Sequence, residues 1–288
     1  MPLDHEKMVN FEYPESEHSY TEQDTILYAL SVGLGAEPNN PDQLKFVYEK
    51  DLQALPMMAG ILGWLGRRPD PGFGVNLKKV VAGEQKIILH KPLPTSATFI
   101  SRSKISDVLD KGERTGALIY YERDLFEKES GDLLASIHHT IVARGDGNFG
   151  GKSGPTPPLH ELPERQPDQV CEIQTAPNMA LLYRLNGDEN PLHADPERAQ
   201  AVGFDKPILH GLGTFAVAGH AILQSCCNYD PARLLSLQSR FSRPVFPGDI
   251  IRTEMWIDGD TVSFRSLVSE RDHVVLNNGM AKISNTAS

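Results

Sequence analysis

Cysteine is scarce in this sequence, which contains only Cys171, Cys226 and Cys227. Two of the three are adjacent, and adjacent cysteines rarely pair, so no disulfide framework is expected and a reducing intracellular compartment is favoured. Long apolar runs are also lacking: no stretch of about 18 apolar residues occurs, and residues 1–10 have no signal-peptide core. We therefore expect a soluble chain without membrane insertion.

Basic residues are in deficit. Lys and Arg number 28 against 38 Asp and Glu, which gives a net charge of −10. Such an acidic chain is a poor partner for nucleic acid or anionic membranes. What is present is ordinary for a globular protein, with 40% hydrophobic and 23% charged residues. At roughly 150 residues per domain, the 288 residues predict two domains.

One segment, residues 145–168, is rich in glycine and proline and shows no apolar periodicity. Such a composition is typical of a linker. It divides the chain into two halves, residues 1–144 and 169–288.

The two halves resemble each other. Residues 26–30 (Ile-Leu-Tyr-Ala-Leu) return 155 positions later as Leu-Leu-Tyr-Arg-Leu, and Lys91-Pro92 returns 152 positions later as Arg243-Pro244. Two short matches in the same order favour an internal duplication. Ser19 with Glu22 forms a capping-box pattern before the first of these helices, and Asn178 is a candidate cap for the second.

Each half is expected to place helices before strands, which is an α+β order. The longest apolar helix lies within residues 207–227 and should be buried, with the sheet of its half around it. Its counterpart at residues 55–62 is short, which would leave space in the first half. The predicted strands span residues 85–91, 97–108, 116–126, 133–143, 234–241, 249–257, 262–268 and 274–283.

One polar run stands apart from this packing pattern. Asp188, Asn190 and His193 lie on a segment that Gly187 and Pro191 prevent from forming a continuous helix. A carboxylate and an imidazole that meet at one water can perform general acid-base catalysis. The alternative is that the run is simply a turn and that the histidine caps it or lies on the surface.

Residues 183–193 resemble the hydratase 2 motif of the (R)-specific enoyl-CoA hydratases, a MaoC-like group that includes the hydratase part of peroxisomal multifunctional enzyme type 2. The match continues through Ala199 and His210-Gly211. In the first half, residues 28–35 and 83–85 match less specifically.

The resemblance implies a double hot-dog fold, in which two antiparallel sheets each curl around a central helix. The first copy is expected to be degenerate and non-catalytic, with its vacated space holding the acyl chain. The internal offset agrees, because the positions 155 residues before Asp188 and His193 are Gly33 and Pro38, which cannot exchange protons.

The implied reaction is the reversible hydration of trans-2-enoyl-CoA to (3R)-3-hydroxyacyl-CoA in fatty acid β-oxidation, without a cofactor. By the resemblance, Asp188 and His193 hold the water and move the protons, and Asn190 orients them. The backbone N–H of Gly211, at a helix N-terminus, would stabilise the developing charge on the thioester oxygen.

The substrate-binding residues implied beside these are Tyr183 and His210. CoA phosphates require local cations on an acidic protein, and Arg243 and Lys206 are the candidates, with solvated surface positions as the alternative. No metal is expected, because His193, His210 and His220 show no zinc-binding spacing.

Other functions stay open at this point. A hot-dog thioesterase or a dehydratase of carrier-bound acyl chains would share the fold, and so would a non-catalytic acyl-binding module. The family further implies a homodimer and fusion to a dehydrogenase part in a longer polypeptide. The peroxisome is implied by the family alone, since residues 285–288 do not form a Ser-Lys-Leu type of ending.

Overall fold

The computed structural model describes residues 3–64 and 72–284. Residues 285–288, on which the prediction about the chain ending rests, lie outside this described part. The first half contains α1 (His5–Val9), β1 (Ser16–Tyr20), α2 (Glu22–Leu30), α3 (Pro41–Leu44), η1 (Pro56–Gly60), η2 (Leu77–Lys79), β2 (Val80–Leu89), β3 (Ala97–Asp110), α4 (Gly112–Thr115), β4 (Ala117–Glu127) and β5 (Leu133–Ala143).

The second half repeats this plan with a longer central helix. It contains β6 (Gln169–Gln174), α5 (Met179–Tyr183), η3 (Arg184–Asn186), η4 (Pro191–His193), α6 (Pro196–Gln200), α7 (Gly211–Cys226), η5 (Pro231–Arg233), β7 (Leu234–Phe241), β8 (Ile250–Asp258), β9 (Thr261–Val268) and β10 (His273–Ile283). No helix in the described part is both long and apolar enough to cross a bilayer.

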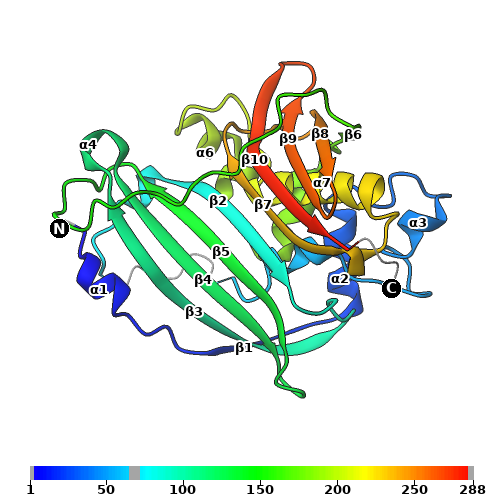
Figure 1. Cartoon of the computed structure of the whole chain (residues 1–288), viewed down its shortest axis with the longest axis horizontal. Helices are drawn as coiled ribbons and strands as arrows, with labels where there is room; N and C mark the ends of the chain where they lie inside the picture. Colours follow the sequence, from blue (N-terminus) through cyan, green and yellow to red (C-terminus); the bar gives the residue numbers. More distant parts are fainter. Residues whose placement is uncertain (1–2, 65–71, 285–288) are drawn as a thin grey trace.

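The strands form one ten-stranded antiparallel sheet in the order β1-β3-β4-β5-β2-β7-β10-β9-β8-β6. Each half contributes five neighbouring strands in the same relative order, and the halves meet where β2 pairs with β7. The two predicted antiparallel sheets are thus present, and the structure joins them edge to edge through this pair (Figure 1). The joint leaves neither β2 nor β7 as an exposed edge.

A pseudo-twofold axis relates the two halves. The rings of Tyr28 and Tyr183 lie 6.1 Å apart, and the Asn186 side-chain amide donates to Ser31 Oγ at 3.0 Å. Both pairs are separated by 155 positions, the offset found in the sequence. Equivalent residues of two copies can touch only near the axis that relates them, so the internal duplication is confirmed.

The central helix α7 is buried from Gly213 to Leu223. It packs against the sheet of the second half, as Figure 1 shows for the yellow helix beside β7 and β10. The helix α7 can approach η1 and β7 closely because residue 219 is a glycine. A Cβ at Gly219 would come within 2.5 Å of Met57 in η1 and 3.1 Å of Leu237 in β7. In the first half the corresponding place is taken by η1, a single short 3₁₀-helix, as predicted.

The predicted helix caps need correction. The capping box of α2 is made by Thr21 and Asp24, not by Ser19 and Glu22, because Ser19 belongs to β1 and its hydroxyl pairs with that of Thr98. Asn178 does stand at the N-cap of α5, but its side chain makes no capping hydrogen bond.

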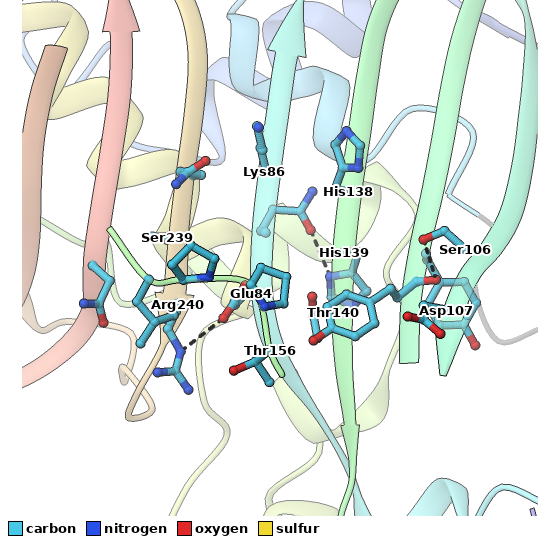
Figure 2. A pocket seen from close by; sticks show the side chains of 18 of the residues that line it. Glu84, Lys86, Ser106, Asp107, His138, His139, Thr140, Thr156, Ser239 and Arg240 are labelled. Carbon is cyan, nitrogen blue, oxygen red and sulfur yellow. Dashed lines mark hydrogen bonds and ion pairs between the residues drawn. The ribbon is translucent and has the colours of Figure 1, made fainter. Parts of the chain in front are cut away.

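Residues 144–168 run between β5 and β6 without helix or strand. They cross the face of the sheet that is turned away from α7, and residues 155–160 help to enclose a polar cavity of about 740 Å³ there (Figures 1 and 2). On its floor Arg240 lies 3.3 Å from Glu84, and His138 Nδ1 lies 3.9 Å from Glu122.

Buried histidines predict how stability depends on pH. Burial lowers the pKa of His220 to about 4 and that of His210 to about 3, against about 6.5 for an exposed histidine. Below about pH 6.5 the unfolded chain binds protons that the folded chain does not, so the free energy of unfolding should fall as the pH falls toward 4.

The variant His220→Gln is expected to lose its share of this slope, which is about 1.4 kcal/mol per pH unit. Urea unfolding of both proteins between about pH 7 and pH 5 measures the difference. Parallel pH profiles for the two proteins would show that His220 has the same pKa in the folded and the unfolded chain.

Candidate active site

The polar run folds into the predicted loop. η3 ends at Gly187, whose φ of 112° lies in the left-handed region that favours glycine, and η4 begins at Pro191. Between them Asp188 Oδ1 accepts the N–H of Asn190 at 3.2 Å, and Asn190 Oδ1 accepts the N–H of Leu192 at 3.2 Å. These side chains therefore fix the loop that carries His193.

Three predicted site residues converge. Asp188, His193 and His210 each offer one ligand atom, and these atoms lie within 4.8 Å of one another. The two imidazole rings are stacked, with centroids 3.8 Å apart and planes inclined by 27°. Both histidines are buried. The structure thus brings one carboxylate and two imidazoles together at one point.

The hydrogen bonds determine the tautomers of the two rings. His193 Nδ1 is 2.8 Å from the carbonyl oxygen of Ile208, and a carbonyl only accepts, so Nδ1 carries the proton. Nε2 is then the ring atom that can take up a proton. His210 Nε2 likewise donates to the carbonyl oxygen of Asp188 at 3.0 Å.

His210 is therefore a neutral acceptor at its other ring nitrogen. Its Nδ1 is buried and has no hydrogen-bond partner in the part of the chain that the structure describes. Burial, and then the neighbouring His193, lower the pKa of His210 to about 3, so the ring stays uncharged near neutral pH. An unpaired acceptor in this position can bind a proton of a water or substrate.

Tyr183 closes the site on one side. Its ring lies 4.8 Å from that of His210. Burial raises the pKa of the Tyr183 hydroxyl well above its usual range, and the neighbouring Tyr28 and Asp188 act in the same direction. The hydroxyl is therefore a neutral donor.

Gly211 is the first residue of α7, and His210 is its N-cap without a capping hydrogen bond from the side chain. Gly211 is exposed, and a Cβ there would lie 3.4 Å from the ring of Phe241. The first N–H groups of a helix have no partner within it and carry partial positive charge. The Gly211 N–H thus belongs to the positively polarised end of α7, directly after His210. Its role as a donor to a developing oxyanion stays a prediction.

The two predicted cations lie outside this cluster. Arg243 is exposed just after β7, and Lys206 is exposed with its ammonium 5.2 Å from the centre of the Phe246 ring. The guanidinium of Arg271 lies over the same ring, also at 5.2 Å. A role of Arg243 and Lys206 in binding CoA stays a prediction.

Phe241 is a neighbour of the site that was not predicted from the sequence, since it lies against Gly211. Arg271 was not predicted either; it lies beside Phe246, near the candidate cation Lys206, and makes a two-pronged ion pair with Asp249 at 2.9 and 2.6 Å. Neither belongs to a recognisable motif. Phe241 appeared only as the last residue of a predicted strand.

Comparison with known proteins agrees with the two-half architecture. The family model of the MFE-2 hydratase 2 N-terminal domain matches residues 18–145, and that of the MaoC like domain matches residues 158–278. An enoyl-CoA hydratase 2, peroxisomal, from Arabidopsis thaliana is 39% identical over 91% of this chain and 90% of its own length. Peroxisomal multifunctional enzyme type 2 of Mus musculus is 39% identical over 94% of this chain, which spans 37% of that protein.

Solved structures give the same result. A MaoC-like dehydratase from Phytophthora capsici superposes with a TM-score of 0.87 at 32% identity, over 98% of this chain and 99% of that one. A Mycobacterium tuberculosis protein described as a double hotdog fold has a TM-score of 0.56 at 14% identity, over 95% and 94% of the two chains. That likeness concerns the fold alone and confirms the predicted class. The chain belongs to the enoyl-CoA hydratase 2 group of the MaoC-like family, whose members are hydro-lyases.

Proposed function

We propose that this chain reversibly hydrates trans-2-enoyl-CoA to (3R)-3-hydroxyacyl-CoA in fatty acid β-oxidation. The observation that carries the proposal is the convergence of Asp188 and His193 beside the N-terminus of α7. The relatives named enoyl-CoA hydratase 2 support it. The peroxisomal relatives favour a peroxisomal location, and the multifunctional relatives favour fusion to further enzyme parts.

The chemistry requires a proton to leave the water that attacks the β-carbon, and a proton to reach the α-carbon. The carboxylate of Asp188 and Nε2 of His193 hold the water and exchange these protons. The Ile208 carbonyl fixes the ring of His193, much as a buried acceptor orients a catalytic imidazole elsewhere. Asn190 holds the loop that positions Asp188 and His193, through its hydrogen bonds to Asp188 and Leu192.

Negative charge develops on the thioester oxygen as the water adds. The N–H of Gly211, at the N-terminus of α7, is proposed to donate to that oxygen, where the helix dipole also favours an anion. These two effects act in the transition state more than in the ground state, which is what catalysis requires.

The first half is proposed to hold the acyl chain and not to catalyse. Its central helix is reduced to η1, and the positions that correspond to Asp188 and His193 are Gly33 and Pro38. A homodimer stays a prediction from the family.

The test is an assay of the purified chain with trans-2-hexenoyl-CoA and chiral analysis of the product. Loss of the enoyl absorbance and formation of the 3R alcohol are expected, with no free thiol released from saturated acyl-CoA. Dialysis against EDTA should leave the rate unchanged, although Asp188, His193 and His210 are ligand types that zinc accepts.

Each alternative function predicts a different result in this assay. Thiol release would favour a thioesterase, and tight binding without change of absorbance would favour a binding module. The 3S product would contradict the family assignment of the stereochemistry. A rate lost with EDTA and restored by zinc would contradict metal-free catalysis.

A further inference from the structure

A row of polar side chains crosses the face of the sheet that is covered by α7 and η1. It comprises Ser103 in β3, Arg123 in β4, His139 in β5, Gln85 in β2 and Ser239 in β7, and is called the polar belt below. Ser103 and Arg123 are register partners, and Gln85 is the partner of both His139 and Ser239. Partners in an antiparallel pair share one face.

The belt lies on the helix side of the sheet. Ser239 is two residues from Leu237, which faces α7, so both point to that side. Arg123 donates to the carbonyl oxygen of Gly60 in η1 at 2.7 Å, and Gln85 Oε1 is 2.9 Å from His139 Nδ1. In the first half the belt therefore occupies the place that a full central helix would cover.

Several polar atoms of the belt lack hydrogen-bond partners among the described residues. Gln85 and Ser239 are only 2% and 3% exposed. Within residues 3–64 and 72–284, no hydrogen-bond partner exists for Gln85 Nε2, Ser239 Oγ, Ser103 Oγ or Arg123 Nε. Buried polar atoms without partners cost free energy, and each such group calls for an explanation.

Arg123 is the most unusual member. Among the described residues no carboxylate forms an ion pair with it. Burial lowers its pKa to about 10, so the guanidinium remains charged near neutral pH. A buried charge without a counter-ion is unfavourable unless something else pairs with it.

The position of the belt points to the acyl chain as the source of that partner. Ser239 is two residues along β7 from Phe241, whose ring lies beside Gly211 at the active site. From β7 the belt continues through β2 and β5 to β4, which is about 15 Å at ~4.8 Å per strand. A long acyl chain whose thioester is at Gly211 would place its far end near Arg123.

We infer that the polar belt binds a carboxylate at the far end of the acyl chain, so that the chain accepts ω-carboxy enoyl-CoA substrates. This inference rests on the proposed function and narrows its substrate class. The unsatisfied atoms of Arg123 and Gln85 and the two serine hydroxyls are donors, whereas a carboxylate only accepts. A guanidinium matches a carboxylate with two parallel hydrogen bonds.

The experiment compares trans-2-hexadecenoyl-CoA with its ω-carboxy counterpart. For the unaltered protein, kcat/KM should be higher with the ω-carboxy substrate. In Arg123→Met, kcat/KM for that substrate should fall by about 10- to 100-fold, the range for hydrogen bonds to a charged group, while the rate with trans-2-hexadecenoyl-CoA is retained. The variant should also melt at the same or a higher temperature, because it no longer buries an unpaired charge.

Two further variants sharpen the test. Arg123→Lys keeps the charge but loses the two-pronged geometry, so it should recover part of the selectivity. Arg102→Met removes an exposed arginine of the neighbouring strand that pairs with Glu15 at the surface. This variant should leave kcat/KM unchanged for both substrates. If Arg123→Met does not fold, Gln85→Met and Arg123→Lys carry the comparison.

Binding of saturated hexadecanedioyl-CoA, followed by titration calorimetry, separates this inference from the proposed function. Weaker binding to Arg123→Met than to the unaltered protein supports the carboxylate site even without turnover. Equal binding, or an equal loss of activity toward both substrates, would overturn it. Crotonyl-CoA is too short to reach the belt, so failure to hydrate it counts against the proposed function alone.

Discussion

Replacing Asp188 with asparagine is expected to lower kcat for enoyl-CoA hydration by about 10²- to 10⁴-fold, the usual contribution of a positioned acid or base. Asparagine has nearly the same shape and can still accept the N–H of Asn190 through its side-chain oxygen, so the loop should persist. It cannot take up the proton of the water. His193→Ala is expected to cause a loss of similar size, since it removes the ring that Ile208 orients.

The measurement is the initial rate of absorbance loss, together with a thermal melt that shows whether each variant is folded. Glu189→Gln is the matched control, because Glu189 is the exposed carboxylate next to Asp188 on the same loop. Its rate should be nearly unchanged. If a folded Asp188→Asn or His193→Ala variant kept a near-normal rate, the assignment of the acid-base pair would be wrong.

Replacing Gly211 with proline is expected to lower kcat by about 10²- to 10³-fold, as found when one oxyanion donor is removed. Proline deletes the N–H but is well tolerated at the first position of a helix. The preceding residue also permits it, since His210 has φ −56° and ψ 139°, an extended conformation that a following proline favours.

Gly211→Ala keeps the N–H and serves as the control. Its Cβ would lie 3.4 Å from the Phe241 ring, a contact that a small ring movement relieves, so kcat should remain within a few-fold of the unaltered value. Equal rates for the proline and alanine variants, both folded by circular dichroism, would show that another group stabilises the oxygen.

The strands that build the centre of the sheet could be predicted well. β5 and β7 begin and end at the predicted residues, because both are rich in aliphatic residues and end at turn signals. The duplication could also be predicted from the sequence. The first pair of matching segments falls on helices α2 and α5, and the second pair follows strands β2 and β7. These features depend on local pattern, which a sequence displays directly.

The edge strands β1 and β6 could not be predicted in the same way. Their sequences, Ser-Glu-His-Ser-Tyr and Gln-Val-Cys-Glu-Ile-Gln, alternate polar and apolar residues weakly over a short length. Each is held as a strand by its partner, β3 or β8, and not by its own propensity. The capping box of α2 was displaced for the same reason, because β1 takes up Ser19.

The site was predictable only in part. The order of Asp188, Asn190 and His193 identified the loop, whereas the stacking of His210 on His193 depends on a contact between residues 17 positions apart. The polar belt depends on which residues of neighbouring strands pair with each other. In the sequence its members appear as isolated polar residues within apolar strands, and only the pairing of β3, β4, β5, β2 and β7 brings them onto one face, with a two-residue step between Arg123 and His139.

The joint between β2 and β7 has an evolutionary consequence. In a symmetric pair of identical chains, every substitution appears at both sites at once. Here both copies belong to one polypeptide, so Gly33 and Asp188 could diverge independently, as could Pro38 and His193. Covalent linkage thereby released each copy from the demands made on the other, and one could specialise in recognising a substrate while its twin retained the ancestral chemistry.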